Sequence, residues 1–139
     1  MFYPQIKDGN ATYNFDDITA SDICVTDVII DADGDKAVKL LIFLAFKTKL
    51  VIIKYTYYPE NFNKNLIRDE AINFNSNSTN VLIIKESDPN RINSIEFMGL
   101  NDVRVKGNYL YLVDEKLHMV LRYDIEYLRK TDDGTHWNK

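Results

Sequence analysis

Two runs of apolar residues, at positions 38–46 and 50–58, constrain the fold of this chain more than any other feature. They are separated by Lys47, Thr48 and Lys49 and are typical of the two strands of a β-hairpin. Side chains alternate between the faces of a strand, so a turn centred on positions 48–49 leaves one face without any charge. That face consists of Leu40, Ile42, Leu44, Phe46, Val51, Ile53, Tyr55 and Tyr57. The other face is half apolar and consists of Leu41, Phe43, Ala45, Ile52, Lys54 and Thr56.

A hairpin that is apolar on both faces cannot form the outer layer of a small monomer. A helix, another sheet or a partner subunit must cover the second face. We expect the cover to be a second copy of the chain, because isologous dimers are the commonest solution for such a surface. The predicted homodimer interface contains Leu41, Phe43 and Ile52.

A helix over residues 36–47 is the alternative interpretation of the first run. Asp35 is a suitable N-cap for such a helix. Helical spacing at i, i+3, i+4 and i+7 is found at Ala37, Leu40, Leu41 and Leu44. Periodicity alone does not separate a strand from a helix over so short a run, so both interpretations stay open at this point.

A second hairpin is predicted between residues 103 and 123, with its tip at positions 114–117. Pairing Val113 with His118 and Tyr111 with Val120 gathers the apolar side chains on one face. That face contains Leu110, Leu112, Met119, Leu121 and Tyr123. The opposite face is amphipathic and contains Tyr109, Tyr111, Val113, His118, Val120 and Arg122.

The remaining segments add further strands and turns to these two hairpins. Residues 23–30 and 81–85 are rich in β-branched side chains and predict strands, and we favour a strand at 92–98. Residues 1–21 are polar and predict an irregular N-terminal arm with one short edge strand, whereas 131–139 predict a flexible tail. We therefore expect a single domain over 1–139, an all-β and mostly antiparallel sandwich or partly open barrel with one or two short helices.

Composition excludes several classes of protein. The net charge of −4 argues against affinity that comes from neutralising many phosphates. The lone Cys24 cannot form an internal disulfide, and Lys47 and Lys49 interrupt the most apolar stretch, so we expect a cytoplasmic protein without a membrane span. Residues encoded by AT-rich codons are abundant, which permits an origin in a mobile genetic element such as a phage or plasmid.

The usual signatures of metal sites and enzymes are missing from the sequence. The acidic run at 31–35 begins like a calcium loop, but Lys36 stands where an EF-hand requires Gly and Ile42 where it requires Glu. One Cys and the two distant residues His118 and His136 cannot form a closed zinc site in one chain. We expect no metal, no cofactor and no catalytic residue, with a hydrolase built from distant carboxylates as the remaining enzymatic alternative.

Tyrosines are the one unusual resource of this sequence. Tyr109, Tyr111, His118 and Arg122 share a predicted face, and aromatic residues with Arg recur at protein interfaces. Rings that are simply half-buried in a sandwich core are the structural alternative. We expect a non-enzymatic protein–protein interaction or assembly protein, such as an inhibitor, an immunity-type protein or a structural component. The second hypothesis is a single-stranded nucleic-acid binder with an OB-like barrel. The residues that support it form a basic stripe, Lys85, Arg91, Arg104, Lys106 and Arg122.

Overall fold

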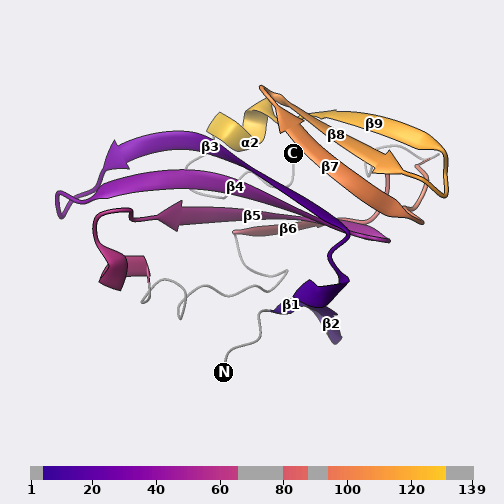
Figure 1. Cartoon of the computed structure of the whole chain (residues 1–139), viewed down its shortest axis with the longest axis horizontal. Coiled ribbons are helices and arrows are strands. Elements are labelled where there is room, and N and C mark those ends of the chain that lie inside the picture. Colours follow the sequence, from indigo (N-terminus) through magenta and orange to yellow (C-terminus); the bar gives the residue numbers. More distant parts are fainter. Residues whose placement is uncertain (1–4, 66–79, 88–93, 131–139) are drawn as a thin grey trace.

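A computed structural model describes residues 5–65, 80–87 and 94–130 of the chain. Their strands form three antiparallel sheets, β1-β2, β3-β4-β5-β6 and β7-β8-β9 (Figure 1). Short helices are limited in this part of the chain to η1 (Phe15–Asp17), a helical turn at 62–65 and α2 (Glu126–Lys130). The predicted all-β class is therefore confirmed, as an open sandwich and not as a closed barrel. None of the described helices is long and apolar enough to cross a membrane.

The first predicted hairpin is formed by β4 (Lys36–Phe46) and β5 (Lys49–Tyr57). Phe46 pairs with Lys49 and Leu44 with Val51, whereas the turn assumed from the sequence would pair Phe46 with Val51. The true pairing differs from the predicted one by two residues, because the turn contains only Lys47 and Thr48. A shift of two residues leaves every side chain on its predicted face. The helical alternative for 36–47 is wrong.

One face of the sheet β3–β6 is covered by the sheet formed from β7 (Leu100–Lys106), β8 (Tyr109–Asp114) and β9 (Met119–Asp124) (Figure 1). The helix α2 and the residue before it, Ile125, close the same core. Its buried side chains are Leu41, Phe43, Ala45, Leu50, Ile52, Phe97, Leu100, Val103, Leu110, Leu112, Ile125 and Leu128. The second hairpin therefore supplies the cover that the sequence analysis assigned to another copy of the chain.

The N-terminal residues cover part of the opposite face of the same sheet. They form β1 (Gln5–Asp8), β2 (Ala11–Asn14) and η1, where the sequence predicted an irregular arm with a single short strand. Ile6 is fully buried in this second cluster. It packs there with Leu44, Phe46, Val51, Ile53 and Val81. The arm is thus a structural layer over the end of the sheet that contains the β4–β5 turn.

Two long strands of the sheet end in a tight acidic turn. β3 (Ala20–Ile30) pairs along its length with β4, and its register shifts between Val25 and Asp27. The turn at 31–35 is closed by a hydrogen bond of 2.9 Å from Asp31 N to Asp35 O. Gly34 has a φ of 84°, which glycine adopts without the steric cost that a Cβ brings. The short β6 (Val81–Ile84) completes the sheet on its other side.

In the second hairpin the observed pairing also differs by two residues from the predicted one. Val113 pairs with Val120 and Tyr111 with Arg122, so the faces are again as predicted. Residues 94–98, from the predicted strand 92–98, make only one isolated bridge, between Glu96 and Glu86. The first two residues of that prediction and the predicted tail at 131–139 lie outside the described residues.

Candidate functional site

The three side chains expected at a homodimer interface lie in the core of the chain itself. Leu41 and Ile52 are 1% exposed and Phe43 is 0% exposed. They pack against the side chains on the inner face of β7–β9, which include Leu110 and Leu112. This surface is therefore closed within one molecule, and the need for a partner at this face no longer exists.

Three of the four predicted binding residues come together on the outer face of β7–β9. The strand register places Arg104, Tyr111 and Arg122 in one row across the three strands. The Arg122 guanidinium lies 4.6 Å from the ring centroid of Tyr109. Arg104 completes the row, although the sequence analysis counted it only in the basic stripe. The outer face therefore carries an aromatic and cationic group, Arg104, Tyr109, Tyr111 and Arg122, which we call the Tyr/Arg row.

His118, the fourth predicted residue, lies outside this row. It occupies the β8–β9 turn, is exposed, and has a φ of 52°. The turn begins after Asp114, which pairs with Met119, so His118 has no strand neighbour on the outer face. The predicted register paired His118 with Val113 and therefore placed it on the outer face. In the structure Val113 pairs with Val120, and the last pair of the two strands is Asp114 with Met119.

The charges on the outer face of β7–β9 are mixed. Arg104, Lys106 and Arg122 share this face with two aspartates. Asp102 pairs with Val113, and Asp124 pairs with Tyr109. Arg104 Nε lies 3.5 Å from Asp102 Oδ1, and the two side chains are 77% and 43% exposed. An exposed pair of this kind contributes little to stability, and it lowers the positive potential of the surface.

An exposed apolar strip runs along β3, and the sequence analysis did not single it out. Ile23, Val25, Val28 and Ile30 are 52%, 50%, 50% and 67% exposed. The register shift after Val25 keeps all four on one face of the sheet despite their uneven spacing. Tyr57 joins them, because it pairs with Val38, the partner of Val28. We call these five side chains the β3 strip.

The missed signal was the spacing of the apolar residues in 23–30. A regular strand would place residues 23 and 25 on one face and residues 28 and 30 on the other. Side-chain alternation alone therefore does not predict that these four residues share a face. The bulge at Thr26, between Val25 and Asp27, restores the common face. Thr26 Oγ1 indeed donates a hydrogen bond of 3.2 Å to Lys39 O at this bulge.

Several backbone groups of β3 already form hydrogen bonds with side chains. Asp22 Oδ1 accepts a hydrogen bond of 2.8 Å from Ile23 N, and Asp27 Oδ1 accepts one of 2.9 Å from Val28 N. Arg129 Nη2 donates a hydrogen bond of 3.3 Å to Val25 O. These contacts leave fewer groups for an added strand, so the strip offers its apolar face and not its edge to a partner.

The acidic turn at 31–35 binds an internal cation. Lys64 Nζ lies 2.5 Å from Asp31 Oδ2 and 3.0 Å from a carboxylate oxygen of both Asp33 and Asp35. Hydrogen bonds from Lys64 hold the pKa of Asp31 below its usual value. The hydrogen bond with Asp31 in turn raises the pKa of Lys64. The ammonium group thus lies against all three carboxylates, whose ligand atoms are within 4.8 Å of one another.

Cys24 has a pKa above its usual value, which disfavours the reactive thiolate. Burial raises the pKa of Cys24, despite the opposing effect of Arg129, whose Nη1 lies 3.2 Å from the sulfur. A thiol that is neutral at physiological pH is a poor nucleophile. Cys24 also packs against the main core as a small apolar residue.

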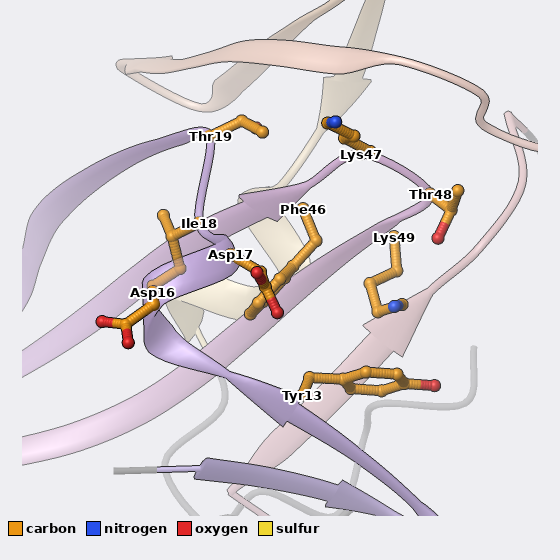
Figure 2. Close-up of a pocket in the computed structure, with 9 residues that line it drawn as sticks. All are labelled: Tyr13, Asp16, Asp17, Ile18, Thr19, Phe46, Lys47, Thr48 and Lys49. Carbon is orange, nitrogen blue, oxygen red and sulfur yellow. The ribbon is translucent and has the colours of Figure 1, made fainter. Parts of the chain in front are cut away.

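A hollow of about 430 Å³ lies beside the β4–β5 turn (Figure 2). Phe46, Ile18 and Tyr13 are its buried or partly buried walls, whereas the remaining lining side chains are polar. Those are Asp16, Asp17, Thr19, Lys47, Thr48 and Lys49. Sequence reasoning missed this hollow because it forms between the N-terminal layer and the hairpin, two segments that it did not place together.

Comparisons with known proteins add no assignment to these surfaces: no protein family, no curated protein and no solved structure matches the chain.

Proposed function

We propose that this is a non-enzymatic interaction protein that self-associates through the β3 strip. The observation that supports the proposal is the exposure of Ile23, Val25, Val28 and Ile30, each at least 50% open on one face of one strand. Contiguous apolar surface of this kind marks interaction sites in soluble proteins. Such a module suits an inhibitor, an immunity-type protein or a structural component of a phage or plasmid in the cytoplasm.

The occupant that fits the strip is a second copy of the same chain. The strip contains no charged side chain, so two copies related by a twofold axis bring apolar groups onto apolar groups. Five such side chains, each about half exposed, offer on the order of 400 Å² per copy. A total of about 800 Å² is smaller than the roughly 1,200 Å² that stable specific interfaces bury, so the proposed dimer is a weak and transient one whose population depends on concentration.

Salt dependence follows from the charge of the chain. Each copy has a net charge of −4, so two copies repel one another at low ionic strength. Added salt screens this repulsion and strengthens apolar contact. Self-association through the β3 strip should therefore increase with salt.

Sedimentation velocity over a range of protein concentrations tests the proposal. The parent should shift from monomer towards dimer, and Val28→Asp and Ile30→Asp should remain monomeric. Val120→Asp is the matched control, because Val120 is 73% exposed on the outer face of β9, away from the strip. A parent that stays monomeric up to about 1 mM, or a Val28→Asp variant that still dimerises, contradicts the proposal.

A second candidate function is single-stranded nucleic-acid binding at the Tyr/Arg row. The specific observation in its favour is the alignment of Tyr111 between Arg104 and Arg122, which suits stacking of bases and contact with phosphates. It is the weaker candidate because the charges of this face are mixed and because the described strands form open sheets and not a closed barrel.

Fluorescence anisotropy with a labelled oligothymidine separates the two functions. Binding at the Tyr/Arg row should weaken steeply with salt and should fall in Arg122→Ala but not in Val28→Asp. No binding in low salt eliminates this candidate.

A further inference from the structure

We propose that the hollow beside the β4–β5 turn binds a small zwitterion with an apolar side chain, of the class of free α-amino acids. The α-carboxylate would accept hydrogen bonds from Lys49 Nζ and the α-ammonium would donate to the Asp17 carboxylate. The apolar side chain would lie against Ile18 and Tyr13. None of these residues belongs to the β3 strip or the Tyr/Arg row.

Lys49 is the first observation behind this assignment. Its Nζ lies 3.5 Å from the ring centroid of Tyr13 and 5.6 Å from that of Phe46, so the ammonium is held in a defined place at the hollow (Figure 2). No carboxylate of the described residues forms an ion pair with it. A partly buried cation without an anion is costly, and such groups concentrate at binding sites.

The environment of Lys49 agrees with an anion site. Burial, followed by the nearby Lys85 ammonium, holds the pKa of Lys49 below its usual value. A bound carboxylate would favour the charged form and reverse this effect. Lys85 itself is engaged elsewhere, since its Nζ lies 2.7 Å from Asp8 Oδ2.

Two carboxylates on the other side make a purely anionic ligand unsuitable. Asp16 and Asp17 line the hollow, and the negative charge of Asp17 acts on Lys49 although the two groups form no ion pair. An anion would approach Lys49 against the repulsion of these aspartates, and a cation would approach them against Lys49 and Lys47. A ligand that carries both charges satisfies both sides.

The walls of the hollow account for the apolar part of the ligand. Tyr13 is partly exposed at the hollow, and the ring of the buried Phe46 lies behind it, 6.0 Å away and tilted by 48°. Ile18 continues this wall from the N-terminal layer. The volume of about 430 Å³ lies within the range of small-molecule sites.

Titration of the ¹⁵N-labelled full chain with L-phenylalanine and L-leucine tests the site. Shifts should appear at Phe46, Thr48 and Lys49 and should saturate with a Kd of about 1 mM or lower. 3-Phenylpropionate, which lacks the ammonium, and phenethylamine, which lacks the carboxylate, should each bind at least about tenfold more weakly than L-phenylalanine.

Two variants locate the charges. Lys49→Met and Asp17→Asn should each weaken binding of L-phenylalanine by about tenfold or more, while Lys106→Met on β7 should bind like the parent. Asp17 is exposed on η1, so its variant keeps the test valid even where Lys49→Met does not fold. Three results overturn the proposal: no shift up to about 10 mM, equal binding of a singly charged analogue, or unchanged binding by Asp17→Asn.

Discussion

The carboxylate of Asp114, at the end of β8, accepts a hydrogen bond of 3.0 Å from the backbone N–H of Gly99, just before β7 begins. It also accepts hydrogen bonds from the N–H groups of Met98, Lys116 and Leu117, at 2.9–3.1 Å. Asp114 is 0% exposed, so these four donors replace water around a buried charge. One side chain therefore connects the start of β7 to the β8–β9 turn.

Removing this charge should destabilise the fold. Asp114→Asn keeps the size of the side chain but has only one acceptor oxygen for four N–H groups, and its amide would face donors. We expect the free energy of unfolding to fall by about 2–4 kcal/mol. Urea denaturation measures this loss. Glu115→Gln, at the exposed neighbouring position, should differ from the parent by about 0.5 kcal/mol or less, and equal stability of both variants would contradict the role of Asp114.

Asp114 should also make stability depend on acid. Burial by itself would raise its pKa, but the four backbone donors outweigh that effect and hold the pKa below its usual value. The unfolded chain therefore binds a proton first, so the contribution of Asp114 is present above about pH 4 and is lost as the pH falls through the lower folded-state pKa. Denaturation between pH 2 and pH 6 should show a steeper acid loss in the parent than in Asp114→Asn. Parallel curves contradict this assignment.

Replacing Lys64 should loosen the turn at 31–35. Lys64→Met leaves three carboxylates whose ligand atoms lie within 4.8 Å of one another, with no cation between them. We expect a lower Tm, which added salt and mild acid partly restore, because screening and protonation both relieve the repulsion. Lys106→Met is the exposed control. Calcium should leave the Tm of the parent unchanged, and a calcium-induced increase would show that a metal displaces Lys64.

The fold class and the composition of each hairpin face follow from side-chain alternation. The partner of each residue in the neighbouring strand does not. A strand repeats every two residues, so pairing Phe46 with Lys49 or with Val51 leaves the same side chains on each face. Only the turn separates these alternatives, and Lys47 and Thr48 carry no strong turn signal. The faces were therefore predictable and the exact partners were not.

What covers each face depends on contacts between distant segments. Phe43 and Leu112 both belong to predicted apolar faces, yet no local pattern states that these faces pack on one another within one chain. Ile6 is isolated among polar residues, so its burial under the N-terminal layer has no periodic signal. The Tyr/Arg row, by contrast, lies within one hairpin and its neighbour, and sequence reasoning found Tyr109, Tyr111 and Arg122.

A charge at Phe43 distinguishes a core position from an interface position. Phe43 is 0% exposed between the two sheets, so even Phe43→Ala should lower the free energy of unfolding by about 3–5 kcal/mol. Phe43→Asp adds an unpaired buried carboxylate and should unfold the chain. Circular dichroism at low protein concentration checks this, with Val120→Ala as an exposed control that should change stability by about 0.5 kcal/mol or less. A Phe43→Asp variant that stays folded as a monomer would show that another molecule, and not β7–β9, covers this face.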